Sequence, residues 1–164
     1  MKIKVLEKTS GCFPQKFDVG DWFDLCLAET VKLKAPTVYN LDVVNFQSCL
    51  VPLGVCMEIP KGFEAIVVPR SSTFKKYGIL QSNSVGVIDG SFSSDKDEWK
   101  MPMVATKSVV IPKGTRVAQF RIQLSQKATS CQKLKWLVSS NVKLVKVDTL
   151  DNPERGGFGS TGEK

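Results

Sequence analysis

The sequence predicts an all-β protein, built as a sandwich or a barrel of short strands. Apolar and polar residues alternate with a period of two in several short segments. Turn-forming proline, glycine, asparagine and aspartate interrupt these segments about every ten residues, and helix signals are few. This combination is typical of sheets that bury one face against a second sheet or close on themselves.

The strands follow from this alternation in chain order. Residues 117–124 give the clearest case, because V-A-Q-F-R-I-Q-L places successive side chains on opposite faces of a strand. Two IPKG turns, at 59–62 and 111–114, separate neighbouring strands and look like similar hairpins. The predicted strands span residues 2–6, 50–59, 63–68, 101–105, 108–111, 117–124, 133–138 and 142–147.

One short helix is predicted over residues 71–77, SSTFKKY. Ser71, Ser72 or Thr73 offers a side-chain oxygen to cap its start, and Gly78 suits its end. From residue 148 the chain becomes rich in glycine and nearly free of apolar residues. We therefore predict a β domain over residues 1–147 and a mobile C-terminal arm over residues 148–164.

The composition excludes several kinds of chemistry. The 164 residues contain no histidine, which excludes Ser-His-Asp and Cys-His catalysis and histidine-based metal sites. The five cysteines are odd in number and form no CxxC, so we expect reduced thiols rather than a disulfide framework or a zinc site. The N-terminus lacks the apolar stretch of a signal peptide, and no run is long enough to cross a membrane. We expect a cytoplasmic protein with no membrane partner.

The net charge of +7 suits a phosphate-bearing partner such as a nucleotide. The lysines and arginines are scattered, however, and a solvated basic surface explains them equally well. There is no basic run of the kind that forms a nucleic-acid-binding arm, so we expect no stable nucleic-acid partner.

The first polar cluster comprises Asp18, Asp21 and Asp24 in the segment FDVGDWFDLCL. Carboxylates attract hard cations such as Mg²⁺, which keep most of their water ligands. A spacing of three would place all three on one face of a helix, but the flanking apolar residues favour a strand, in which Asp24 alone would be functional. A polar loop that precedes a strand is the alternative without function.

The second cluster is Pro69-Arg70-Ser71-Ser72-Thr73. Proline ends a strand, hydroxyl residues open a helix, and free backbone N–H groups at a helix start bind anions. Arg70 adds a fork of N–H donors. Simple N-capping explains the serines but not the arginine, so we predict a phosphate-binding segment.

The third cluster is NSVGVIDGSF, residues 83–92. Gly86 allows a flat ring to approach the backbone, whose N–H and C=O groups can read the edge of a base. Asp89 follows two apolar residues, and partial burial would poise it as a general base on water. Phe92 can pack against a sugar. Each residue also has a simple turn or core explanation.

Two weaker signals complete the series. Gln119 is a polar residue in the predicted strand 117–124, where a lone glutamine is usually solvated. The segment RGGFGSTG, residues 155–162, combines Arg155 with glycines and hydroxyls that can surround phosphate. A disordered tail with an incidental Phe158 is the alternative.

In this order the five motifs resemble those of the trimeric dUTPase family (dUTP diphosphatases), in particular the forms found in bacilli and their phages. The resemblance runs from about Gly20 to Gly162, and its strongest pieces are VVPRSS, NSVGVIDGSF and RGGFGSTG. It implies a jelly-roll-like β subunit that forms a homotrimer, with the arm closing over a neighbour's active site. It also implies Mg²⁺-dependent hydrolysis of dUTP to dUMP and pyrophosphate.

The resemblance assigns a role to each motif residue. Asp89 would orient and activate the water that attacks the α-phosphorus, and Phe92 would stack under the deoxyribose. The residues that would read uracil are Asn83, the backbone of Gly86, Val87 and Ile88, and the main chain of Lys100.

The remaining motif residues would bind the triphosphate and its metal. Asp24 would contact Mg²⁺ through water, and Phe158 would cover the uracil ring. The phosphates would be held by Arg70, Ser71, Ser72, Gln119 and Arg155, and by arm groups at Gly159, Ser160 and Thr161.

Several positions depart from the family pattern. Asp21-Trp22-Phe23 stands where Ala-Gly-Tyr is usual, which leaves Asp21 as a second candidate for the metal. Ser72 replaces a glycine and Phe92 replaces a tyrosine. The segment 93–100 is longer and more acidic than usual, and its Trp99 either shapes the pocket or is structural.

Two alternative functions remain. A dCTP deaminase shares this fold and a similar Arg-Ser-Ser loop, and Glu98 would be its glutamate; the IDGSF and RGGFGSTG segments argue against it. A dUTPase-like protein that binds a regulatory partner is the second alternative, and the intact motif residues argue against a loss of catalysis.

Overall fold

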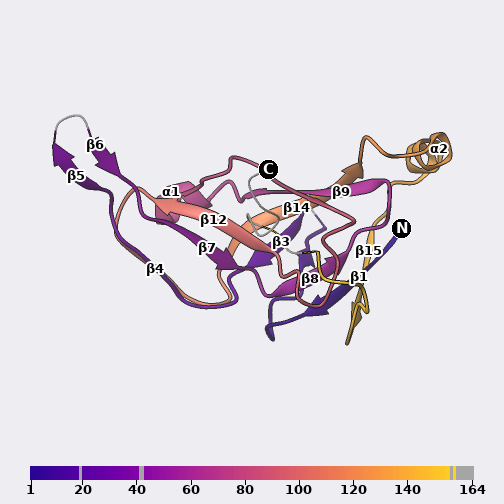
Figure 1. The fold of residues 1–164 in the computed structure, drawn as a ribbon, viewed down its shortest axis with the longest axis horizontal. Helices are drawn as coiled ribbons and strands as arrows, with labels where there is room; N and C mark the ends of the chain where they lie inside the picture. The colour runs from indigo at the N-terminus through magenta and orange to yellow at the C-terminus, as the bar shows by residue number, and fades with distance from the viewer. Residues whose placement is uncertain (19, 41–42, 156, 158–164) are drawn as a thin grey trace.

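The computed structural model describes residues 1–164 except 19, 41–42, 156 and 158–164. The fold is drawn out along one axis, with a β-hairpin at one end and a helix at the other (Figure 1). The strands are β1 Lys2–Glu7, β2 Gln15–Lys16, β3 Phe23–Cys26, β4 Val31–Leu33, β5 Thr37–Asn40, β6 Val43–Asn45, β7 Ser48–Pro52, β8 Val55–Glu58, β9 Phe63–Pro69, β10 Ile79–Gln81, β11 Gly86–Asp89, β12 Lys100–Ala105, β13 Val109–Ile111, β14 Arg116–Leu124 and β15 Lys143–Val147. The helices are α1 Thr73–Tyr77 and α2 Ser130–Val138.

The largest sheet positions most of the predicted site. It has five strands in the order β11-β9-β14-β3-β2, and every neighbouring pair in it is antiparallel. The long strand β14, which the alternation at 117–124 predicts, lies at its centre. Because β9, β14 and β3 are neighbours, motif residues far apart in the sequence come to lie in one sheet.

Smaller sheets complete the β structure. One has the order β10-β12-β7, and another has the order β15-β1-β8, in which β1 pairs with β15 in parallel. The remaining strands form the pairs β13-β4 and β5-β6, the latter being the hairpin at one end of the molecule (Figure 1). The all-β prediction is confirmed.

Aromatic side chains occupy the centre of the core. Phe120 of β14 is fully buried, and its ring lies 5.1 Å from that of Phe23 and 5.1 Å from that of Trp99. The first pair is stacked and the second meets edge to face, both of which are favourable arrangements of aromatic rings. Trp99 is therefore a core residue, which settles the question that its sequence position left open.

The two IPKG turns are built alike, but the prediction that they form hairpins is wrong, because the strands on either side of each turn belong to different sheets. The N–H of Phe63 donates to the carbonyl of Pro60, and that of Thr115 donates to the carbonyl of Pro112. Gly62 and Gly114 have φ angles of 87° and 79°, a region that favours glycine. A proline that presets the turn and a glycine that completes it explain why the same four residues recur.

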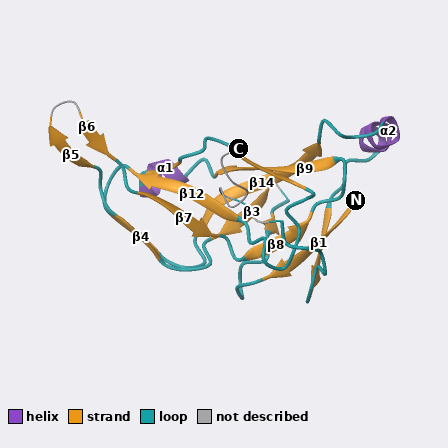
Figure 2. Ribbon diagram, viewed as in Figure 1, coloured by secondary structure: helices purple, strands orange, loops and turns teal. Residues whose placement is uncertain are grey.

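The prediction of a strand at 133–138 is wrong, because these residues belong to helix α2 (Figure 2). The alternation K-L-K-W imitates a strand. A capping box decides the structure: the Thr129 side chain accepts a hydrogen bond from the N–H of Gln132, and the Gln132 side chain accepts one from the N–H of Thr129. Trp136 packs against Phe63 at 5.3 Å. The described part of the chain thus contains two helices, where the sequence predicted one.

Residues 50–59 form two strands rather than one. β7 and β8 belong to different sheets and are separated at Gly54, whose φ is 72°. A Cβ at this glycine would lie 2.8 Å from the Cβ of Cys12, so the turn also needs a residue without a side chain. The other predicted strands lie within two residues of the observed bounds.

The start of the predicted arm is held against its own chain. Leu150 is buried, and its N–H donates to Asp95 Oδ1 at 2.7 Å. Asn152 donates to the carbonyl of Ser93 at 3.2 Å. Residues 149–155 therefore pack on the loop that follows β11, and the mobility of an arm from residue 148 onward stays a prediction. Within the described ranges, no helix has the length and apolar character needed to cross a membrane.

Candidate active site

A cavity of about 310 Å³ brings together many of the predicted residues. It lies where β11, the edge strand of the largest sheet, meets β12 and the end of the chain. Its lining residues are Val67, Gln81, Asn83, Gly86, Val87, Ile88, Asp89, Phe92, Lys100, Pro102, Arg155 and Gly157. Eight of these were predicted from the sequence: Asn83, Gly86, Val87, Ile88, Asp89, Phe92, Lys100 and Arg155.

Asp89 stands at the end of β11 with about half of its side chain exposed. Its Oδ1 accepts hydrogen bonds from the N–H of Ser91 at 2.9 Å and from the Ser91 hydroxyl. These bonds hold the pKa of Asp89 below its usual value, and the charge of Arg155 contributes in the same direction. The expected poising by partial burial is therefore not what controls this group, which is ionised at neutral pH.

Arg155 connects the C-terminal segment to this carboxylate. Its Nη1 lies 3.3 Å from Asp89 Oδ1, and its backbone N–H lies 3.5 Å from Asp97 Oδ2. Asp97 is buried and also accepts from the N–H groups of Ser93 and Ser94. The acidic residues of segment 93–97 thus order this loop and hold the chain near Arg155 beside the cavity.

The glycines of the cavity allow close contacts. A Cβ at Gly86 would lie 3.2 Å from the Cβ of Val67 on the paired strand. A Cβ at Gly157 would lie 2.9 Å from Cε2 of Phe92. The half-buried Phe92 ring therefore lies directly under the backbone of the C-terminal segment. The cavity is narrow enough that any side chain at these two positions would displace its walls.

A second group of predicted residues lies outside this cavity, around the buried carboxylate of Asp24. Arg70 Nε donates to Asp24 Oδ1 at 3.0 Å, and Arg116 Nη1 donates to Oδ2 at 3.1 Å. Gln119 sits opposite Asp24 in the β14–β3 register, and its Nε2 lies 3.5 Å from the carbonyl of Pro69. We call these residues, Asp24, Arg70, Arg116 and Gln119, the arginine cluster.

The serines after Arg70 open helix α1. Ser72 is its N-cap residue and makes no capping hydrogen bond through its side chain, while the hydroxyl of Thr73 donates to the carbonyl of Val117. Gly78 ends the helix with a φ of 67°. The predicted bounds are correct within two residues, but no hydroxyl side chain caps the helix start.

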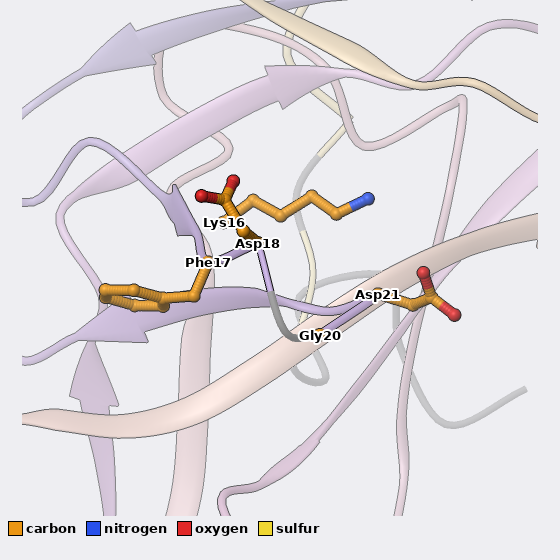
Figure 3. A pocket seen from close by; sticks show the side chains of 5 residues that line it. All are labelled: Lys16, Phe17, Asp18, Gly20 and Asp21. Carbon is orange, nitrogen blue, oxygen red and sulfur yellow. The ribbon is translucent and has the colours of Figure 1, made fainter.

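The three acidic residues of the first cluster, Asp18, Asp21 and Asp24, separate in the structure, and Asp24 lies within β3. Asp18 and Asp21 border a hollow of about 560 Å³ beside Lys16 and Phe17. Their carboxylates point in different directions in this hollow (Figure 3), whereas Asp24 is engaged in the arginine cluster. In the part of the chain that the structure describes, no three cysteine, aspartate or glutamate side chains gather to hold a metal ion.

Some residues of the site were not predicted, and some predicted ones cannot be placed. Gln81 and Pro102 line the cavity, and Arg116 completes the arginine cluster. Arg116 belongs to the same segment as Gln119, but a regular strand would place the two on opposite faces, and the β14–β3 register shifts between Arg116 and Ala118. Gln81 carried no signal. Phe158, Gly159, Ser160 and Thr161 lie outside the described residues.

The chemistry available is that of an ionised carboxylate that can accept a proton from water. The Arg155 guanidinium and a glycine-lined cavity lie beside it, which suits an anionic ligand with a planar ring. The sequence model of a protein family described as dUTPase matches residues 18–162 of the chain. The chain belongs to the dUTPase family.

Curated relatives support this over the full length. The chain is 44% identical over 164 residues to the SPbeta prophage-derived deoxyuridine 5′-triphosphate nucleotidohydrolase YosS of Bacillus subtilis strain 168, covering 100% of this chain and 99% of that protein. It is 28% identical over 166 residues to the deoxyuridine 5′-triphosphate nucleotidohydrolase of Finegoldia magna, covering 99% of each.

Solved structures show the same fold. The dUTPase of Streptococcus mutans superimposes with a TM-score of 0.62 at 24% identity, over 76% of this chain and 95% of that one. A phage phi11 dUTPase from S. aureus, described with a coordinated structural Mg(II) ion, gives a TM-score of 0.61 at 15% identity, over 77% and 93%.

Proposed function

We propose that Asp89 activates the water with which this dUTP diphosphatase hydrolyses dUTP to dUMP and pyrophosphate. One observation carries the proposal: Asp89 lines the same cavity as Asn83, Phe92 and Arg155. Because Asp89 is ionised at neutral pH, it can accept a hydrogen bond from water and orient it toward the α-phosphorus. Ser91 holds the carboxylate in place for this task.

The base and sugar are assigned to the cavity. Backbone N–H and C=O groups of β11 can pair with the edge of uracil, much as they would with a strand, and Asn83 adds a side-chain amide. The Phe92 ring is placed to pack against the deoxyribose, where a 2′-hydroxyl would be crowded. Lys100 borders the same cavity from β12.

The triphosphate is assigned to guanidinium groups. Arg155 lies next to Asp89, and attraction to phosphate oxygens would draw it away from that carboxylate and leave Asp89 for water. A second set of phosphate-binding groups consists of Arg70, Gln119 and the hydroxyls of Ser71 and Ser72. They lie outside the cavity of a single chain, which supports a homotrimer whose subunits share each site.

The metal is assigned to the substrate rather than to a protein cage. When bound, Mg²⁺ neutralises charge on the triphosphate oxygens. Asp24 is the proposed protein contact, through a metal-bound water. Each of its oxygens accepts one arginine N–H and keeps a second lone pair, so the donor set fits an outer contact but not direct coordination.

The deaminase alternative loses its candidate residue. The carboxylate of Glu98 accepts the N–H of Gly54 at 3.0 Å and does not line the cavity. Together with membership of the dUTPase family, this removes the reason to propose dCTP as the substrate. We propose no regulatory partner.

The test is pyrophosphate release with Mg²⁺, with dUTP, dTTP, dCTP and UTP offered separately. We expect release from dUTP alone. Asp89→Asn should lose at least about 100-fold in kcat while still binding the non-hydrolysable α,β-imido analogue of dUTP. Asp148→Asn, at an exposed position remote from the cavity, is the matched control and should keep full activity. Normal turnover by Asp89→Asn would refute the assignment of the base.

The sharing of sites between subunits has its own test. Co-expression of Asp89→Asn full-length chains with wild-type chains that end at residue 155 gives mixed oligomers. If the arm of one subunit completes the site of another, these mixtures regain activity that neither chain has alone. Mixtures that stay inactive would indicate that each arm serves its own subunit.

A further inference from the structure

Gln81 is a buried polar residue that the catalytic roles above do not use. It ends β10 and is 8% exposed, with its amide at the wall of the cavity. Its Oε1 is buried without a hydrogen-bond partner among the described residues. An unpaired buried amide oxygen costs free energy, which the hydrogen bonds of the amide nitrogen must offset.

The other half of the amide makes two hydrogen bonds. Gln81 Nε2 lies 3.3 Å from the backbone carbonyl oxygen of Val67 and 2.8 Å from Asn83 Oδ1. The orientation of an amide is normally ambiguous, because its oxygen and nitrogen look alike. Here it is fixed, since a backbone carbonyl can only accept, and the atom that faces it must be the N–H donor.

This orientation passes to Asn83. The same Gln81 nitrogen can only donate, so Asn83 must present its oxygen toward it. The Asn83 amide then directs Nδ2, with two N–H donors, away from Gln81. Asn83 is exposed and lines the cavity, so these donors are available to a ligand.

We propose that Gln81 is a positioning residue that sets the base specificity of the enzyme by fixing Asn83 with its N–H donors toward the base. The proposal rests on the assignment of Asn83 to uracil. Uracil carries a carbonyl acceptor at C4, whereas cytosine carries an amino donor there. An Asn83 amide fixed as a donor bonds the uracil carbonyl, whereas with cytosine it would set two donors against each other, which disfavours binding. Thymine has the same edge as uracil, so discrimination against dTTP must come from elsewhere.

Two substitutions change the hydrogen bond from Gln81 to Asn83 in different ways. Gln81→Met keeps the length of the side chain and removes the donor, which frees Asn83 to turn. Gln81→Glu, when its carboxylate is ionised, offers only acceptors to Asn83 and so draws the N–H donors of Asn83 away from the cavity. Gln123→Met is the matched control, because Gln123 Nε2 also donates to a side-chain oxygen, Glu64 Oε1 at 2.7 Å, but lies outside the cavity.

The experiment measures kcat/KM for dUTP and dCTP, together with the dissociation constants of their α,β-imido analogues. For Gln81→Met we expect a loss of about fivefold to tenfold in the ratio of dUTP to dCTP, carried by KM while kcat is retained. For Gln81→Glu we expect a larger loss, because binding of the dCTP analogue strengthens. Circular dichroism and oligomer size confirm folding, and Gln123→Met should keep the wild-type ratio.

The outcomes separate this inference from the function on which it rests. If Asn83→Ala lowers the dUTP to dCTP ratio and Gln81→Met does not, the positioning role is refuted and base reading by Asn83 stands. If Asn83→Ala leaves the ratio unchanged, both are refuted. If Gln81→Glu fails to fold, Gln81→Met alone tests the positioning role. The ratio of kcat/KM for dUTP to that for dCTP must then fall in Gln81→Met for the inference to hold.

Discussion

Arg70 at the end of β9 donates through Nε to Oδ1 of the buried Asp24 at 3.0 Å, and this contact fixes a guanidinium that would otherwise move freely. Arg116 occupies the other oxygen, at 3.1 Å. Both arginine side chains keep part of their surface exposed, so they can still reach a phosphate. Asp24 therefore combines a structural role with a proposed contact to the metal.

Asp24→Asn separates these two roles. The loss of the carboxylate charge should lower the free energy of unfolding by about 1–2 kcal/mol and raise KM for dUTP, because Arg70 is no longer held. If Asp24 also contacts the water shell of Mg²⁺, the Mg²⁺ concentration for half-maximal activity should rise. Thermal unfolding and activity at varied Mg²⁺ measure both effects. An unchanged Mg²⁺ dependence beside a raised KM would contradict the metal contact and leave only the arginine role.

Ser91→Ala tests how Asp89 is kept ionised. The Ser91 hydroxyl is the largest cause of the lowered pKa of Asp89, and burial opposes it. Without the hydroxyl, the pKa of Asp89 should rise toward its usual value, while the backbone N–H bond of residue 91 remains. Carboxyl ¹³C chemical shifts followed through an acid titration report this directly. A wild-type titration curve in Ser91→Ala would assign the low pKa to the backbone and Arg155 instead.

The sequence predicts the parts of this fold that local patterns control. From Ala118 to Ile122, strand β14 alternates between buried and more exposed residues, and the two IPKG turns carry their own proline and glycine. The prediction for residues 133–138 is wrong because their alternation fits a strand, whereas a capping box at Thr129 starts a helix. The separation of β7 from β8 depends on Gly54, whose close contact with Cys12 is tertiary.

The site divides in the same way. Asn83 and Asp89 lie six residues apart in one motif, so their meeting in the cavity follows from one short segment of the chain. Gln81 was missed because its importance comes from the carbonyl of Val67, on a strand that no local pattern places beside it. The exposure of Asp89 likewise depends on surrounding structure and not on its apolar neighbours in sequence.

Glu7→Gln tests an ion pair that joins three segments. The Glu7 carboxylate is buried, bonds the ammonium of Lys146 on β15, and accepts the N–H groups of Gly11 and Phe13. The Lys146 contact is the largest cause of its lowered pKa. A lowered pKa means that the stabilisation is present above the unfolded-state value, 4.5, and is lost as the pH falls through the folded-state value.

The variant should therefore lose about 1 kcal/mol of unfolding free energy at pH 7, where the carboxylate is charged. The difference from wild type should shrink as the pH is lowered below about 4.5. Urea unfolding at pH 7 and at several acidic values measures it. Lys4→Gln is a suitable control. Lys4 forms an ion pair with Glu58 in which both side chains are partly exposed, and such a pair contributes little to stability. A Glu7→Gln deficit that does not vary with pH would show that shape, not charge, is responsible.

Leu150→Ala tests whether the start of the C-terminal segment is anchored as the structure shows. Leu150 is 4% exposed, and its N–H bonds the loop at Asp95. Removing the side chain should cost about 2–3 kcal/mol locally, which would release residues 149–155 without unfolding the sheets. Hydrogen exchange should then speed up in this segment and in loop 93–97, but not in β14. Because Arg155 would no longer be held beside Asp89, kcat/KM for dUTP should fall. Exchange that accelerates throughout the chain would instead mark Leu150 as part of the global core.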